Sequence, residues 1–203
     1  MEQHKKKKPL FIVISAPSGC GKSTLIDMLL QEYHDIEYSV SCTTRTPRDG
    51  EEDGIDYHFL KRERFEELLA QNAFIESANV HGNMYGTLKS PIEEALAEGS
   101  SVILDIDVQG AERVREYVRA LPAGNAMQEG YIDIFILPPS IEELRRRLEG
   151  RGTDRQETIE RRLANAQGEI DRAGEYMFRV ENDDLAIAYK RLCDLIDAFG
   201  GRM

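Results

Sequence analysis

The segment APSGCGKST, residues 16–24, constrains the fold of this chain more than any other stretch. It follows a short apolar, β-branched run, LFIVISA at 10–16, and it precedes apolar residues at helical spacing in 22–33. This order of strand, glycine-rich loop and helix is typical of a phosphate-binding loop with the pattern GxxxxGK[ST]. We therefore expect an α/β core that holds a nucleoside triphosphate at the start of this helix.

Each residue type in the loop has a physical task. Gly19 and Gly21 allow backbone N–H groups to turn toward an anion, and the helix that follows adds its dipole. Lys22 offers a charge to the β- and γ-phosphates, and Ser23 is expected to bind Mg²⁺. Ala16 stands where the strict pattern has glycine, which is a modest departure if φ stays negative. We expect the ATP phosphates to contact Ala16, Pro17, Ser18, Gly19, Cys20, Gly21, Lys22, Ser23 and Thr24.

The rest of the chain alternates between strand-like apolar runs and segments of helical periodicity. Further strands are expected at 101–107, 131–137 and 178–181. Further helices are expected at 90–99, 109–120, 141–149, 155–173 and 184–199, with a loop at 122–130 and a capping box of Ser140 and Glu143. Alternation of this kind predicts a parallel sheet with helices on both faces.

Residues 39–89 interrupt this pattern, because helical periodicity appears there only at 62–72. The remainder consists of Thr, Arg, Gly and Tyr in short alternating stretches. This composition predicts an inserted region with its own small sheet and one helix.

A second basic cluster, TTRTPRDGE, places Arg45 and Arg48 on either side of a proline. Two guanidinium groups are suited to bidentate binding of one phosphate monoester, and Tyr57 and Tyr85 offer hydroxyl groups to the same anion. Taken alone, surface arginines in weak ion pairs explain the cluster equally well. Beside a phosphate loop, the pair favours an acceptor that itself carries a phosphate.

Three carboxylates are candidates for the metal site and for the acceptor site. Asp105 and Asp107 end a buried strand, at the edge where open α/β sheets bind ligands, so we expect Asp105 to hold Mg²⁺ through water and Asp107 to point into the acceptor site. Glu76 lies in the apolar stretch FIESANV, where composition alone would make it a solvent-facing strand residue. A carboxylate accepts hydrogen bonds from guanine N1–H and N2–H₂, whereas adenine offers neither donor.

The bulk properties exclude several classes of protein. A net charge of −11 disfavours a general nucleic-acid binder. The three cysteines show no CxxC spacing, which argues against disulfides and structural zinc and fits a cytoplasmic protein. The longest apolar run, Leu10–Ile14, is too short to cross a bilayer, so we expect no membrane association. The chain is expected to be a monomer or a small homo-oligomer.

From about residue 10 to 199 the chain resembles the guanylate kinase family. The matching stretches, in family order and spacing, are SAPSGCGKST, SVSCTTRTPRDGE, DYHF, FIE, GNMYGT, LDIDVQG, RLEGRGT and ENDDL. The resemblance implies an ATP:GMP phosphotransferase that uses Mg²⁺, serves purine metabolism and GMP recycling, and accepts dGMP too. It implies one domain over 1–203 with a P-loop NTPase-type parallel sheet, divided into a core (9–38, 91–140 and 174–203), a mixed α/β GMP-binding insert (39–90) and a helical lid (141–173).

The resemblance also implies roles for individual residues. Arg45, Arg48, Tyr57 and Tyr85 match ligands of the GMP phosphate; Ser41, Glu76, Thr87 and Asp107 match guanine contacts; Arg151 and Arg162 match lid arginines that act with Lys22 and Arg45 in catalysis; Asn182 matches a position near the adenine. Thr87 stands where many relatives carry Ser, which keeps the hydroxyl group.

Two alternatives remain open. One is a catalytically silent module of the same type that binds a protein partner, although the intact Lys22, Ser23, Arg45 and Arg48 argue against it. The other is a P-loop kinase for a different phosphorylated acceptor, against which Glu76 argues.

Overall fold

A computed structural model describes residues 8–150 and 155–201 of the chain. At its centre lies a five-stranded sheet in the order β2-β7-β1-β8-β9, and all neighbouring strands in it are parallel. Its strands are β1 (Phe11–Ser15), β2 (Ile36–Tyr38), β7 (Ser101–Asp105), β8 (Tyr131–Leu137) and β9 (Phe178–Glu181). The predicted parallel sheet flanked by helices is therefore confirmed.

Helices cover both faces of this sheet, which explains why every residue of β1 is buried. Alternate residues of β1 enter two separate cores: Ile12 packs in one and Phe11 in the other. The core around Ile12 includes residues of α1 (Lys22–Glu32), α6 (Ile141–Gly150), α7 (Gln156–Asp171) and α8 (Leu185–Gly200). The core around Phe11 includes residues of α3 (Lys89–Glu98), α4 (Val108–Ala120) and α5 (Ala126–Gly130).

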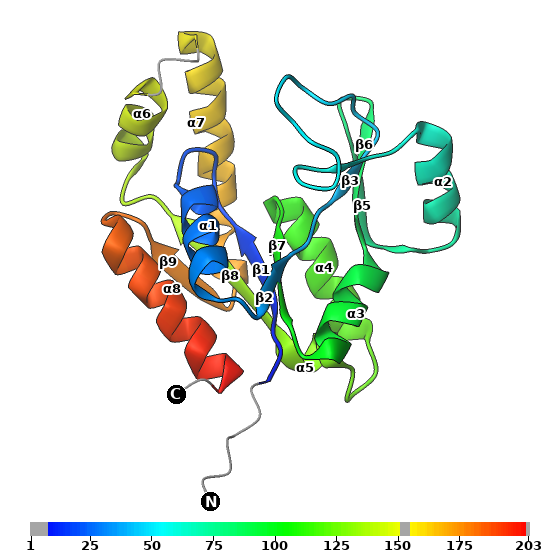
Figure 1. Ribbon diagram of the computed structural model, residues 1–203. Coiled ribbons are helices and arrows are strands. Elements are labelled where there is room, and N and C mark those ends of the chain that lie inside the picture. The colour runs from blue at the N-terminus through cyan, green and yellow to red at the C-terminus, as the bar shows by residue number, and fades with distance from the viewer. Residues whose placement is uncertain (1–7, 151–154, 202–203) are drawn as a thin grey trace, which may run out of the picture.

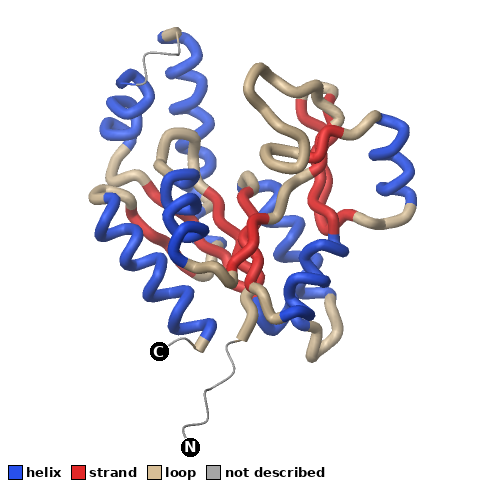
Figure 2. Tube along the Cα trace, viewed as in Figure 1, coloured by secondary structure: helices blue, strands red, loops and turns tan. Residues whose placement is uncertain are grey.

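The predicted insert forms a sheet of its own in the order β4-β3-β6-β5. Its elements are β3 (Cys42–Thr43), β4 (His58–Phe59), α2 (Arg62–Ala70), β5 (Phe74–Val80) and β6 (Asn83–Leu88). A small core of Cys42, Phe65 and Phe74 joins α2 to this sheet. Figure 2 shows the two sheets as separate groups of strands, with α2 on the outer side of the insert.

The insert and the helices α6 and α7 stand on opposite sides of the loop that precedes α1 (Figure 1). A short 3-10 helix, η1 (Ala173–Glu175), leads from α7 back to the central sheet. The phosphate loop expected from the sequence therefore lies between the insert and helices α6 and α7, above the central sheet (Figure 1).

No helix within residues 8–150 and 155–201 has the length and apolar character needed to cross a bilayer.

Several predicted boundaries were wrong, each for a local reason. Strand β7 ends at Asp105 rather than at 107, because the Asp107 side chain caps α4 and accepts a hydrogen bond from Gly110 N at 2.7 Å. The stretch predicted as a loop at 122–130 contains α5, which Asn125 caps through Met127 N at 2.9 Å. Helix α3 begins at Lys89 and ends at Glu98, one residue earlier at each end than expected.

Only half of the predicted capping box is present at the start of α6. Glu143 N donates to Ser140 Oγ at 3.1 Å. The Glu143 carboxylate, however, accepts hydrogen bonds from Arg146 and Arg147 instead of turning back to the backbone of Ser140. Charged partners on the same helix face therefore outcompete the backbone N–H group.

Candidate active site

The phosphate loop makes a sharp turn between β1 and α1. Gly19 and Gly21 adopt φ values of 97° and 82°, which favour glycine. Among the described residues, only Asn72 and His81 combine a side chain with a positive φ. The φ of Ala16 is therefore negative, and alanine can stand where the strict pattern has glycine. All residues from Ala16 to Thr24 line a single cavity of ≈ 630 Å³.

Asn182, which follows β9, stabilises the phosphate loop through a hydrogen bond. Its side chain is 4% exposed, and its Nδ2 donates to Cys20 O at 2.7 Å. A Cβ atom on Gly21 would lie 2.5 Å from the same nitrogen, so the close contact requires glycine there. Asn182 does not line the cavity, and its expected proximity to adenine stays a prediction.

Lys22 forms an ion pair with Asp105 at the floor of the cavity. Asp105 is the last residue of β7, which pairs with β1 so that Asp105 lies opposite Ile14. Lys22 begins α1, which follows β1 through the phosphate loop. Both side chains are about one-fifth exposed, at 19% and 20%. Asp105 therefore holds the lysine at the point where the loop opens, in addition to the Mg²⁺ role expected for it.

The insert forms the opposite wall of the same cavity. Ser41, Tyr57, Glu76 and Tyr85 all line it, together with Asp107 at the start of α4. The rings of Tyr57 and Tyr85 meet edge to face, with centroids 6.0 Å apart. The structure thus brings five predicted acceptor residues to one space with the phosphate loop.

Glu76 is the most buried acid of this wall, at 8% exposure. The Thr87 hydroxyl donates to Glu76 Oε1 at 3.0 Å, and the hydroxyls of Ser41 and Thr87 lie 3.5 Å apart. Burial raises the pKa of the Glu76 carboxyl, while the Thr87 hydroxyl and the Arg113 guanidinium act in the opposite direction. Thr87 itself is fully buried behind Glu76 and does not line the cavity.

Arg45 and Arg48, which are expected to bind one phosphate together, both contact Glu51. Both guanidinium nitrogens of Arg45 donate to Glu51 at 2.9 Å, and the group lies 5.4 Å from the ring centroid of Tyr57. Arg48 is exposed, and its backbone N–H donates to Glu51 at 2.8 Å. Neither arginine lines the cavity, so their contact with a phosphate remains a prediction.

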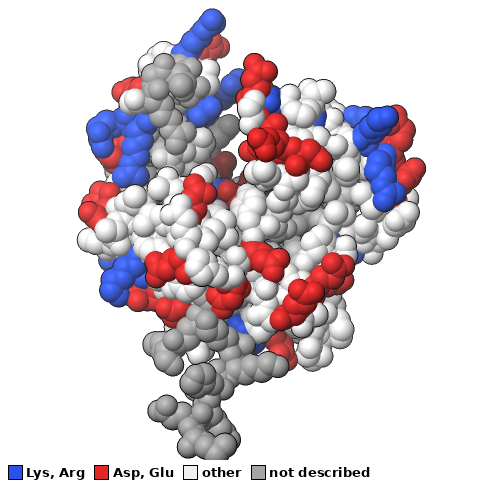
Figure 3. All heavy atoms as spheres, viewed as in Figure 1, with Lys and Arg blue, Asp and Glu red and all other residues white. Residues whose placement is uncertain are grey.

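Of the two arginines predicted to close on the phosphoryl group, the structure describes only Arg162. Arg162 of α7 donates from Nη1 to Ser18 Oγ at 3.4 Å, so α7 contacts the phosphate loop. Arg151 lies outside the described residues. Figure 3 shows the surface hollowed between helices α6 and α7 and the insert, with acidic side chains along its rim.

Glu169, which lines the cavity from α7, was not predicted from the sequence. Burial raises the pKa of its carboxyl, the charge of Asp107 adds to this, and Lys22 opposes it. A signal existed: Glu169 lies seven positions after Arg162, a spacing that places both on one face of a helix. Glu51 was missed as well, although it stands inside the TTRTPRDGE segment.

Comparison with known proteins identifies the group to which this site belongs. The family model described as "Guanylate kinase" matches residues 7–199. Proteins named guanylate kinase from Dechloromonas aromatica and Neisseria meningitidis are each 47% identical, over 93% and 95% of this chain and 88% and 89% of their own.

A solved structure agrees with these sequence matches. The crystal structure of guanylate kinase from Anaplasma phagocytophilum superposes with a TM-score of 0.72 at 35% identity, over 96% of this chain and 88% of that one. The chain belongs to the guanylate kinase family.

Proposed function

We propose that this chain transfers the γ-phosphoryl group of ATP to GMP, and also to dGMP, giving ADP and the nucleoside diphosphate. One observation carries the proposal: the phosphate loop and the buried Glu76 face the same cavity. A triphosphate on Lys22 and a purine at Glu76 would therefore bring donor and acceptor together. Membership in the guanylate kinase family supports the same reaction.

Phosphoryl transfer requires that the two nucleotides are positioned together and that positive charges surround their phosphates. The GMP phosphate is already an anionic nucleophile, so no general base is needed. Lys22, Arg45, Arg151 and Arg162 are the cations that we assign to the phosphate groups. In this structure Lys22 and Arg45 are paired with acids, which keeps both side chains ordered before any phosphate arrives.

Guanine selection is assigned to the wall formed by the insert. An ionised Glu76 would accept from guanine N1–H and N2–H₂, and an adenine ring would leave the carboxylate unpaired. Ser41 and Thr87 form a chain of hydroxyl groups that ends on Glu76. The Asp107 carboxylate is fixed at the cavity wall by its bond from Gly110 N, so it can meet the ring from the other side.

The residues present fit a magnesium ion. Ser23 and Asp105 offer oxygen ligands in the same cavity, and Mg²⁺ at such sites is held by few protein groups and by the phosphates. When bound, the ion would neutralise charge that develops on the β- and γ-phosphates. We assign Ser23 as a direct ligand and Asp105 as a ligand through water.

We further propose that the insert (39–90) and the lid (141–173) close over the core (9–38, 91–140 and 174–203) when both nucleotides bind. The reason is the exclusion of water, which would otherwise take the phosphoryl group. The contact between Arg162 and Ser18 supports a lid that approaches the loop directly.

We also propose that the protein works in the cytoplasm as a monomer or a small homo-oligomer. Its three cysteines are free thiols, which suits a reducing compartment. Light scattering of the purified chain would give the number of subunits.

A coupled assay of ADP release with GMP, dGMP, AMP, UMP, CMP and dTMP as acceptors tests the proposed reaction. GMP is expected to be the best acceptor, followed by dGMP. If none of these acceptors were phosphorylated, the silent binding module would be favoured instead. A non-guanine nucleotide as the best acceptor would show a P-loop kinase of different specificity.

A further inference from the structure

The buried Glu76 carboxylate poses an electrostatic problem. Its side chain lies at the junction of the insert and the core and is only 8% exposed. Burial disfavours the charged form of a carboxyl group. Guanine recognition needs that charged form, because a protonated carboxyl presents a donor where the ring also presents donors. A positive charge close to Glu76 would resolve the conflict.

The groups that act on Glu76 come from β6, which pairs with β5, and from α4, which packs against it. From β6, Thr87 donates its hydroxyl and Tyr85 lines the same cavity. From α4, Asp107 adds a negative charge, which raises the pKa of Glu76, and Arg113 adds a positive charge, which lowers it. Arg113 is therefore the cation of α4 that acts on this carboxylate.

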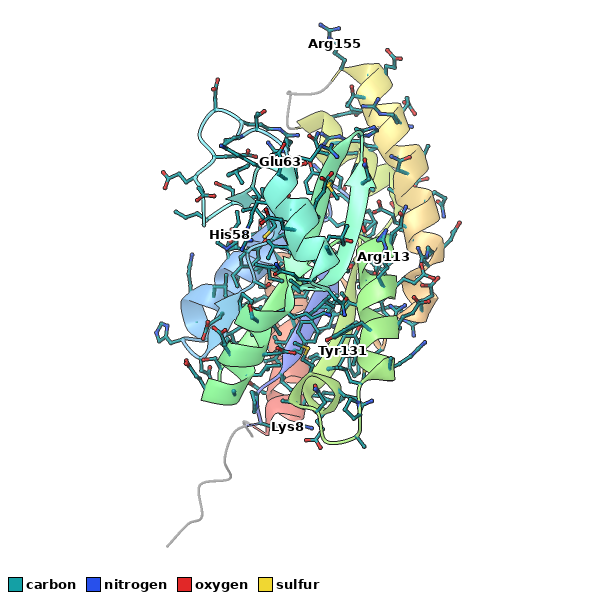
Figure 4. The ribbon with its side chains drawn as sticks, turned by 90° about the vertical axis from the view of Figure 1, so that its right-hand side faces the viewer. Lys8, His58, Glu63, Arg113, Tyr131 and Arg155 are labelled. Atoms are coloured by element: carbon teal, nitrogen blue, oxygen red, sulfur yellow. The ribbon has the colours of Figure 1, made fainter. Side chains whose placement is uncertain are left out.

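The other cation at this junction, Lys89, is occupied elsewhere. Its ammonium group donates to Asn72 O at 2.6 Å and lies 4.9 Å from the ring centroid of Tyr117. Tyr117 follows Arg113 by one helical turn, so both residues lie on the face of α4 that meets the insert. Figure 4 labels Arg113 where α4 meets the long strands of the insert.

Arg113 itself has an unusual environment. Its Nη1 atom is buried, and no hydrogen-bond acceptor contacts it among the residues that the structure describes. A buried donor without a partner is costly, and such groups in native proteins call for an explanation. Attraction between this charge and the Glu76 carboxylate offsets part of that cost without a direct hydrogen bond.

We propose that Arg113 is a positioning residue that stabilises the ionised Glu76 carboxylate and thereby prepares the acceptor pocket for guanine. The proposal rests on the proposed function, since it assigns the guanine ring to Glu76. It predicts that neutralising Arg113 raises the pKa of Glu76. At low pH more of the carboxyl is then protonated and GMP binds weakly, whereas at high pH the variant and the wild type converge.

The test compares Arg113→Gln, which removes the charge and keeps N–H donors, with Arg113→Lys, which keeps the charge. Arg119→Met is the control, an exposed arginine on the same helix. Affinity for GMP is measured by calorimetry from pH 6 to 9. Arg113→Gln is expected to bind GMP about tenfold more weakly at pH 6, with the difference closing by pH 9. Arg113→Lys and Arg119→Met should follow the wild type, and kcat at saturating GMP should stay within about twofold in all of them.

A second measurement needs no nucleotide. The Glu76 carboxyl carbon is titrated by ¹³C NMR in the unliganded protein, with its signal identified from Glu76→Gln. A raised pKa in Arg113→Gln, but not in Arg113→Lys, supports the proposal. An unchanged pKa overturns it, as does a loss of GMP affinity that is equal at every pH or shared by Arg113→Lys. If the wild type failed to phosphorylate GMP, the proposed function would fall, while the effect of Arg113 on Glu76 would still be decided by the titration.

Discussion

Arg45 donates from both terminal guanidinium nitrogens to the Glu51 carboxylate at 2.9 Å, six residues later in the chain. The same carboxylate accepts the backbone N–H of Arg48 at 2.8 Å. One acid therefore orders both the side chain of the first arginine and the backbone of the second. In the proposed reaction this order precedes the arrival of the GMP phosphate.

The first prediction concerns this acid. In Glu51→Gln, Arg45 loses its charged bidentate partner, and we expect KM for GMP to rise roughly tenfold because Arg45 must be ordered at binding. Steady-state kinetics measure this, with kcat at saturating GMP changed little. The control is Glu52→Gln, an exposed acid next in sequence. A lower KM would contradict the account, since it would mean that Glu51 competes with the phosphate for Arg45.

The second prediction concerns Lys22, whose ammonium group pairs with Asp105 in the cavity. Lys22→Met is expected to reduce ADP release by at least about 100-fold, because a charge at the transferring phosphoryl group is lost. Affinity for GMP, measured by calorimetry, should stay near the wild-type value. Lys190→Met, on the exposed side of α8, is the control. Retained turnover in Lys22→Met would refute the role assigned to it.

The third prediction concerns the hydrogen bond from Asn182 to the phosphate loop. Asn182→Ala leaves the Cys20 carbonyl without the amide that donates to it at 2.7 Å, and it removes a well-packed side chain. We expect a loss of about 1–3 kcal/mol in the free energy of unfolding, measured by urea denaturation, and weaker ATP binding. Asn165→Ala, at an exposed position of α7, should change neither. Full stability in Asn182→Ala would show that the loop holds its shape alone.

The fourth prediction concerns pH and the first turns of α6. Hydrogen bonds from Arg146 and then Arg147 lower the pKa of Glu143 from 4.5 to about 2. A carboxyl whose pKa is lowered by folding stabilises the protein above its unfolded pKa, and the effect is lost as the pH falls toward the folded value. Glu143→Gln should therefore melt below the wild type at pH 7, and the difference in Tm should shrink between pH 4.5 and 2. A difference that is constant over this range would exclude the ion pairs as its cause.

The sequence predicts what depends on local pattern. The phosphate loop, the parallel core and the inserted region follow from short-range order and apolar spacing, and the structure confirms the sheet and its helices. Helix α5 was missed because five residues with one terminal glycine carry almost no periodic signal. Asp107 was assigned to a strand because an apolar, β-branched run leads into it, whereas its side chain caps the next helix.

The hydrogen-bond and ion-pair partners of several site residues could not be predicted from the sequence. Pairing of Lys22 with Asp105, and of Asn182 with Cys20, joins residues far apart in the chain, so only the folded topology brings them together. The same holds for Glu169, which reaches the cavity only because α7 returns past the phosphate loop. The pattern also gave no sign that Glu51 would orient the guanidinium group of Arg45.

The most direct test of the central claim is the ratio of kcat/KM for GMP over AMP in the wild type and in Glu76→Gln. We predict that the wild type prefers GMP by at least about 1000-fold, because AMP leaves a buried carboxylate unpaired, and that the ratio collapses in the variant. Control measurements of ATP affinity should agree between the two proteins. A wild type that phosphorylates AMP as well as GMP, or a ratio that the substitution leaves intact, would contradict the claim that Glu76 selects guanine.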